Sequence, residues 1–333
     1  MILVHQFEPH KDAAGKMATL VQRQLGSGET IPLGTVWVDL LEPTSEERRA
    51  AEGFAGVTLP TPEKMDEIEP SELLYSDDGV RYMTARILCL AKTSRPKIAN
   101  IAFIRKEGVL VTIRDDDPKP FQTFAQRAQR SGVAMNDPEA VFVGLVDAIV
   151  GRAAEALRDA GDSIDELSES IFERAAARRH PQNAEYQETL TTLGREGARI
   201  SKARESLVSI EMMLRFASAA GPGSEDAEPE GHIGTMLRDM SSLETHTEYL
   251  LGKVQFLLDT TLGLVNVNQN DIVKILSVIM AVFTPPTFIA SMYGMNFKNM
   301  PEYNWSFGYQ YGLALMLLSA VLPYLFFRWK KWL

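Results

Sequence analysis

Cysteine is nearly absent from this chain, since Cys89 is the only one among 333 residues. A single thiol excludes an internal disulfide framework and a multi-cysteine zinc site within one chain. Cys89 has apolar neighbours, so we interpret it as a small buried hydrophobe. The five histidines are scattered and lack the spacing that metal ligands need.

The motifs of soluble catalysis are missing as well. The sequence has no phosphate-binding glycine loop, no nucleophile elbow and no paired-histidine helix motif. An enzyme is therefore the least supported class, and no organic cofactor is expected. Nucleic acid is not an expected partner either, because phosphate binding needs a basic surface and the formal net charge is -10. An acidic soluble part can instead concentrate cations near it.

Two long stretches without charge lie near the C-terminal end. Residues 275–297 and 303–327 are free of charged side chains over about 23 and 25 residues, and about 20 are enough for a helix to cross the bilayer. We therefore predict two transmembrane helices, with the lipid bilayer as a partner. Aromatic residues mark the edges of these spans, as in a membrane–water belt: Tyr303, Trp305, Tyr309, Trp329 and Trp332.

The flanking charges predict the orientation of this hairpin. Lys274 precedes the first span, a basic tail (328–333) follows the second, and the short connector 298–302 carries one charge of each sign. Positive charge on the inner side then places both chain ends in the cytoplasm and the connector outside. No secretory signal opens the sequence, so we expect the N-terminal part to stay in the cytoplasm.

The first span carries a polar stripe that the second lacks. Its members recur at alternating spacings of four and three residues, which places them on one face of a helix. They are Asn266, Asn270, Val273, Ser277, Met280, Thr284, Thr287 and Ser291. Polar groups in hydrocarbon are costly unless they face water or a partner. The stripe is thus either a helix–helix contact or a pore wall built from several copies. Pro285-Pro286, in the middle of this span, should kink the helix or loosen one turn.

Helix-capping patterns and strand-like runs in residues 1–135 predict a mixed α/β domain. Thr44-Ser45-Glu46-Glu47 has the pattern of a capping box that opens a helix, and Thr61-Pro62 has that of a cap and first helical residue. Strand-like runs occur at Ile2–Phe7, Thr35–Leu40, Val80–Leu90, Ile98–Ile104 and Val109–Ile113.

The segment 136–231 has helical periodicity and an acidic first half. A break near His180-Pro181 predicts an antiparallel helix pair, and 219–231 has the composition of a flexible linker. From residue 232 no strong helix breaker occurs before Pro285, so a stalk helix (232–274) should run into the membrane.

The most specific motif lies at the outer end of the first span. Tyr293-Gly294-Met295-Asn296 resembles the signature of the CorA family of magnesium and cobalt transporters. The similarity extends through Met300-Pro301-Glu302 and Trp305-Ser306-Phe307-Gly308-Tyr309 to the closing Lys331-Trp332-Leu333. The layout of the whole chain is similar too.

The resemblance implies an α/β cytoplasmic domain, a long helical stalk and two C-terminal transmembrane helices, assembled as a funnel-shaped homopentamer in a bacterial inner membrane. It implies a divalent-cation channel for magnesium, with cobalt and nickel as further candidates. Influx would be driven by the membrane potential and gated by intracellular magnesium, so magnesium is both cargo and regulator. Gly294, Met295 and Asn296 would form the selectivity filter. The pore-lining positions would be Asp259, Asn270, Val273, Leu276, Thr284 and Thr287.

The family's intracellular magnesium sensor uses acidic residues between subunits. Met65-Asp66-Glu67-Ile68 and Leu237-Arg238-Asp239-Met240 match its two sides, so Glu67 and Asp239 are the candidates for a regulatory metal. A solvated surface carboxylate is an equally good interpretation of each. Some relatives have methionine at the positions of Val273 and Thr284, which leaves the narrowest point of the pore open.

Two other functions stay open at this point. A related branch transports zinc, usually with a different residue in the middle of the signature, and Met295 favours magnesium. The chain could also be a membrane-anchored sensor or scaffold, but that function leaves the polar stripe and Asn296 unexplained.

Overall fold

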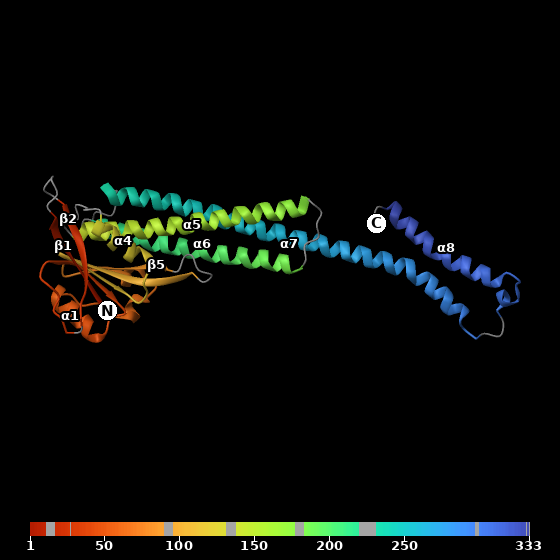
Figure 1. Cartoon of the computed structure of the whole chain (residues 1–333), viewed down its shortest axis with the longest axis horizontal. Helices are drawn as coiled ribbons and strands as arrows, with labels where there is room; N and C mark the ends of the chain where they lie inside the picture. The colour runs from red at the N-terminus through yellow and green to blue at the C-terminus, as the bar shows by residue number, and fades with distance from the viewer. Residues whose placement is uncertain are drawn as a thin grey trace. The chain divides into compact units, whose positions relative to one another are not determined.

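The structure is a computed structural model, and it describes residues 1–10, 17–26, 28–89, 96–130, 138–176, 183–219, 231–296, 300–330 and 332 (Figure 1). The chain divides into two compact units. The first comprises Met1–Ser170 and Gln187–Leu257, and the second comprises Ile171–Tyr186 and Leu258–Leu333. The segment boundaries expected from the sequence remain predictions.

The first unit is built on a sheet with the strand order β2-β1-β3-β7-β6-β5-β4. Only the β3–β7 pairing of this described sheet is parallel. The strands are β1 (Ile2–His10), β2 (Met17–Gln24), β3 (Thr35–Leu41), β4 (Leu74–Asp77), β5 (Val80–Cys89), β6 (Lys97–Lys106) and β7 (Val109–Arg114). Five of them confirm the predicted strands, although Leu90 lies outside the described residues.

The two strands that the sequence did not predict lie at the edges of the sheet. Leu20 is the only buried residue among the described side chains of β2, and β4 is four residues long with none buried. Both therefore lack the alternation of apolar and polar residues on which strand prediction depends.

Among the described helices, the first four along the chain are short and the last four are long. They are α1 (Ser45–Ala55), α2 (Pro62–Met65), α3 (Pro70–Leu73), α4 (Lys119–Arg130), α5 (Pro138–Ala176), α6 (Asn183–Ser218), α7 (Gly231–Tyr293) and α8 (Gly308–Trp329), with a 3-10 helix, η1, at Pro301–Asn304. The capping box of α1 is confirmed: the Glu47 N–H donates to Thr44 Oγ1 at 3.2 Å, and the Thr44 N–H donates to Glu47 Oε2 at 2.8 Å. Thr61 caps α2, with Pro62 as its first residue.

One face of the sheet forms an apolar core with α1 and α2. Val38 and Leu40 of β3 lie in this core beside Val111 and Ile113 of β7, and none is more than 1% exposed. Ala51 of α1 and Met65 of α2 belong to the same cluster. The opposite face carries a different set of residues, because side chains alternate between the two faces of a strand.

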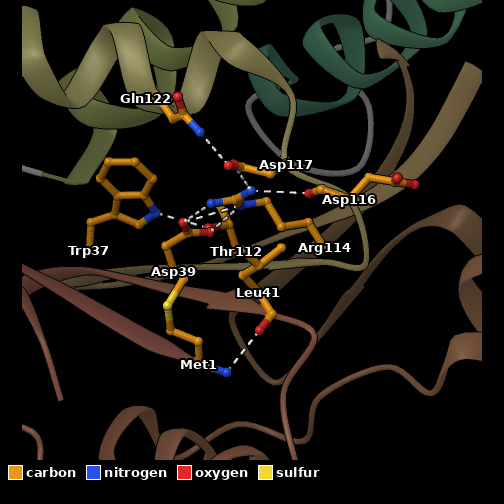
Figure 2. Close-up of polar contacts among 9 residues, drawn as sticks. All are labelled: Met1, Trp37, Asp39, Leu41, Thr112, Arg114, Asp116, Asp117 and Gln122. Carbon is orange, nitrogen blue, oxygen red and sulfur yellow. Dashed lines mark hydrogen bonds and ion pairs between the residues drawn. The ribbon is translucent and has the colours of Figure 1, made fainter. Parts of the chain in front are cut away.

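That opposite face contains a buried polar row (Figure 2). Asp39 of β3 accepts hydrogen bonds from Arg114 Nη2 at 2.8 Å and from Thr112 Oγ1 at 2.7 Å. Trp37 Nε1 donates in turn to Thr112 Oγ1 at 2.9 Å. The Arg114 guanidinium also bonds the Asp116 carbonyl at 3.0 Å and lies 4.6 Å from the ring centroid of Phe121 on α4. Every charge in this row thus has a partner, as burial requires.

His5 extends the polar row to β1. Its ring stacks on that of Trp37 with a centroid separation of 3.9 Å. Burial, together with the charge of Arg114, lowers the pKa of His5 to about 3. The imidazole is therefore neutral at physiological pH and adds no charge to the Asp39–Arg114 ion pair.

The helices α5, α6 and α7 run side by side in the first unit (Figure 1). A Cβ added at Gly161 of α5 would be 3.5 Å from Leu250, and one added at Gly197 of α6 would be 3.5 Å from Val254, so α7 packs closely on both. An ion pair of 2.9 Å between Arg204 and Glu248 also joins α6 to α7. The predicted pair of helices is confirmed as α5 and α6. His180-Pro181 and almost all of the expected linker lie outside the described residues.

The free edge of β5 is covered by side chains of α6. Strand β4 pairs with Val80–Met83 alone, so the later part of β5 has no neighbouring strand on that side among the residues that the structure describes. There the Arg86 N–H donates to Ser209 Oγ at 2.9 Å, and the Leu88 N–H donates to Ser206 Oγ at 3.1 Å. These serine hydroxyls replace a strand's carbonyl groups and satisfy backbone donors that would otherwise be unpaired.

In the second unit each predicted span overlaps a long apolar helix, and the boundaries of the spans themselves remain predictions. Helix α7 ends at Tyr293, and α8 begins at Gly308. The Gly294 N–H bonds the carbonyls of Ala290 and Ser291 at 3.0 and 3.2 Å, which tightens and closes the last turn of α7. Pro285-Pro286 lies inside α7 and does not end it. Both helices remain long and apolar enough to cross a membrane.

Candidate ion-conduction site

The signature residues Gly294, Met295 and Asn296 form an exposed turn directly after the end of α7. The Met295 N–H still donates to the Met292 carbonyl at 3.3 Å, whereas Asn296 is the first residue beyond the turn. All three signature residues are exposed in the single chain. The carboxamide of Asn296 is therefore available to a ligand at the end of the helix, with an oxygen that can accept hydrogen bonds.

Steric crowding explains why residue 294 is a glycine. A Cβ at this position would stand 3.3 Å from the Ala290 carbonyl oxygen, which is tighter than ordinary van der Waals contact. A side chain there would push against the carbonyl that accepts the Gly294 N–H. Gly294 thus permits the tight turn that presents Asn296.

The described connector residues 300–307, which precede α8, are folded against its start. There the Trp305 N–H donates to the Glu302 carbonyl at 3.2 Å, and the Gly308 N–H donates to the Trp305 carbonyl at 3.1 Å. A Cβ at Gly308 would be 2.2 Å from the Glu302 carbonyl oxygen, a distance that no side chain can occupy. Sequence reasoning treated Gly308 only as part of a weak small-xxx-small pattern with Gly312. The structure shows that Gly308 is needed for this close approach.

The polar stripe of α7 faces away from the rest of the described chain. The six predicted pore positions are all exposed, and Val273 and Leu276 are 59% and 51% exposed. Thr287 Oγ1 donates to the Phe283 carbonyl at 2.7 Å, and its oxygen can still accept hydrogen bonds. Asn270 and Thr287 are 17 residues apart, which corresponds to about 25 Å along a helix at ~1.5 Å per residue. This part of the stripe is thus nearly as long as the ~30 Å hydrocarbon layer is thick.

The two regulatory candidates, Glu67 and Asp239, are both exposed, and the cleft that one of them lines does not include the other. Met65 is buried and Asn100 Nδ2 donates to Asp66 Oδ1 at 2.6 Å, which fixes the backbone next to the exposed Glu67. Asp239 of α7 lines a cleft of about 720 Å³ between α4, α5 and α7, and Glu67 does not line it. Lys119, Arg127 and Arg152 are its basic lining residues. Among the described residues, no three histidine, cysteine, aspartate or glutamate side chains are placed to hold a metal ion.

Comparison with known proteins shows to which family this chain belongs. The family described as CorA-like Mg2+ transporter protein matches residues 33–331. The chain is 32% identical over 308 residues to the magnesium transport protein CorA of Escherichia coli strain K12, an alignment that covers 92% of this chain and 94% of that protein. The chain belongs to the CorA family. As a member it is a transporter and not an enzyme.

Other CorA relatives agree with this assignment. The magnesium transport protein CorA of Salmonella typhimurium is also 32% identical, with 90% of this chain and 93% of that protein covered. The solved CorA magnesium transporter of Methanocaldococcus jannaschii has a TM-score of 0.72 at 16% identity and covers 100% of this chain and 99% of its own. It confirms the predicted fold: an α/β N-terminal domain, a long helix and two C-terminal apolar helices.

Two further solved structures share the fold at lower identity. The full-length CmaX protein has a TM-score of 0.66 at 14% identity, with 95% of this chain and 94% of its own covered. The cytoplasmic domain of ZntB from Vibrio parahaemolyticus has a TM-score of 0.56 at 12% identity, with 78% of this chain and 96% of its own covered. At such identities the likeness concerns the fold alone.

Proposed function

We propose that this chain is a magnesium channel through which the membrane potential drives influx without nucleotide hydrolysis. The observation that carries the proposal is the exposed Gly294-Met295-Asn296 turn at the end of a 63-residue helix whose polar face is also exposed. The 32% identity to proteins named as magnesium transporters supports magnesium as the cargo. Cobalt and nickel, which also form hydrated divalent ions, are further candidates.

The exposed stripe fits a homopentamer in which the α7 helices surround a common axis. Five copies of Asn296 would then form a ring of amide oxygens at the outer entrance, framed by Gly294 and Met295. Magnesium gives up its water reluctantly, so amide oxygens that accept hydrogen bonds from its hydration shell suit it. A ring of carboxylates would hold the ion more strongly and slow its release.

Below the entrance the proposed pore changes in character. Thr287, Thr284 and Asn270 supply polar groups along its wall, and Val273 and Leu276 supply an apolar constriction between them. Asp259, near the inner end, would attract cations there. No fuel is needed, because two charges that move through 100 mV release about 4.6 kcal/mol. The basic tail and Lys274 support an orientation with both chain ends in the cytoplasm of a bacterial inner membrane.

The direct test is magnesium uptake into liposomes that contain the purified full-length protein. Magnesium-free liposomes with an inside-negative potassium diffusion potential and no nucleotide should take up magnesium, as a trapped magnesium-sensitive dye would report. Protein-free liposomes, and liposomes without the potential, are the controls. No uptake at low internal magnesium would support the membrane-anchored sensor or scaffold instead. Faster uptake of zinc than of magnesium would support the zinc-transporting alternative.

We further propose that internal magnesium closes the channel by binding between Glu67 of one copy and Asp239 of the next. The support is that both carboxylates are exposed and that Glu67 does not line the cleft at Asp239. The Glu67→Ala/Asp239→Ala variant should therefore need about tenfold more internal magnesium for half-closure, because a carboxylate ligand is lost on each side. Uptake at graded internal magnesium measures this shift.

The matched control for the regulatory site is Glu69→Ala, an exposed carboxylate two residues from Glu67. It should leave the closing concentration unchanged, because the loss of one nearby surface charge is screened by salt. An unchanged magnesium dependence in the double variant would refute the assignment of Glu67 and Asp239.

A further inference from the structure

A cavity lies where the end of α7 meets the connector and the start of α8. It has a volume of about 580 Å³, and the aromatic residues Tyr293, Trp305 and Tyr309 line it. Glu302 is the only charged residue among its described lining residues. Gly294 also lines it, but Met295, Asn296 and the proposed pore-lining residues do not.

The polar part of the cavity is held in place by the fold of the connector. Glu302 belongs to the 3-10 helix η1, and its carbonyl accepts from Trp305 and lies against Gly308. The Trp305 ring contacts the rings of Phe307 and Tyr311, each at a centroid distance of 5.5 Å. Glu302 and Trp305 therefore belong to one ordered turn and line the same cavity.

The remaining lining of the cavity is mostly apolar. Ala290 of α7 and Leu313 and Met316 of α8 contribute to it, and Ser306 adds one hydroxyl group. The cavity is thus amphipathic, with one negative charge and aromatic rings beside hydrocarbon side chains of both helices. Because two apolar helices end here, it lies at a boundary between lipid tails and water.

We propose that this cavity binds the ammonium headgroup of a membrane phospholipid. Aromatic rings beside a carboxylate are the chemistry that recognises alkylammonium ions, through cation–π attraction and charge complementarity. The apolar floor accommodates the first carbons of the acyl chains. A hydrated metal ion would gain nothing from that floor, and a soluble amine would lack the local concentration that a bilayer provides.

The experiment compares two lipids that differ only in the headgroup. Delipidated full-length protein is incubated with an equal mixture of phosphatidylethanolamine and phosphatidylglycerol of matched acyl chains, and the retained lipid is measured by native mass spectrometry. The wild type should retain the ethanolamine lipid preferentially. Glu302→Gln should lower that retention roughly tenfold and leave the glycerol lipid unchanged. Glu107→Gln, in the β6–β7 turn of the first unit, is the matched carboxylate control and should match the wild type.

A second pair of variants covers the case in which Glu302→Gln disturbs the turn. Trp305→Phe should keep most of the preference because a ring remains at this position, whereas Trp305→Leu should weaken it because only the rings of Tyr293 and Tyr309 are left. Equal retention of both lipids by the wild type, or an unchanged preference in Glu302→Gln, would overturn the proposal. Loss of the wild-type preference on addition of magnesium alone would overturn it in favour of a metal site. Because lipid retention is read without transport, a failure of the channel proposal would leave this result intact.

Discussion

Replacing Asn296 by alanine is expected to reduce potential-driven magnesium uptake to the level of protein-free liposomes. The carboxamide is the exposed polar group at the end of α7, and in an assembly of five copies the substitution removes five of them at once. Without these acceptors, a hydrated divalent ion must either shed water, which magnesium does reluctantly, or enter an apolar opening in which its hydration shell has no hydrogen-bond partners. Initial uptake rates in the liposome assay measure the effect.

The matched control is Asn304→Ala, which removes an exposed asparagine of η1 in the same connector region. This variant should conduct at close to the wild-type rate, because Asn304 lies outside the signature. A normal uptake rate in Asn296→Ala, with the protein correctly assembled, would refute the placement of the entrance at the signature. Asn296→Asp is a useful companion, since a carboxylate ring should bind the ion more tightly and release it more slowly.

Replacing Arg114 by methionine should lower the free energy of opening the sheet by about 3–5 kcal/mol. The side chains of Arg114 and Asp39 are 3% and 2% exposed, so the substitution leaves a carboxylate buried without its counter-ion. Hydrogen exchange of the β3 and β7 backbone amides in the full-length protein reports this free energy without requiring two-state unfolding of the whole chain.

Two comparisons make the ion-pair prediction specific. The double variant Asp39→Leu/Arg114→Met should be less destabilised than the single one, because no unpaired charge is left in the sheet. Arg23→Met breaks an exposed ion pair of 3.0 Å with Glu29 and should cost less than about 1 kcal/mol. A single Arg114→Met variant as stable as Arg23→Met would contradict the structural role assigned to the buried pair.

Local sequence signals were enough to predict the parts of the fold that depend on neighbouring residues. Thr44 and Glu47 form the capping box that their spacing predicts, and the strands β1, β3, β5, β6 and β7 follow apolar runs. The buried polar row was not predicted. Asp39 and Arg114 are 75 residues apart, and only the parallel pairing of β3 with β7 brings them together. No periodicity within either strand contains that information.

The candidate site shows the same division between local and long-range information. The composition of the spans predicted two apolar helices, but their ends depend on backbone bonds at Gly294 and on the connector turn before Gly308. The signature could be recognised from four consecutive residues. Whether Glu67 and Asp239 meet depends on contacts between copies, which the residues of one chain do not encode locally.

The serine hydroxyls that cover the edge of β5 have a consequence for synthesis. Ser206 and Ser209 follow the strand by about 120 residues, so the ribosome needs roughly 6–24 s at about 5–20 residues per second to deliver them. In the later part of that interval, once β6 and β7 have been made, the sheet has its core but lacks the cover of α6 on one edge, which another nascent chain could extend. The newborn domain is therefore most exposed to aggregation before α6 emerges, and this interval is when a chaperone would protect it.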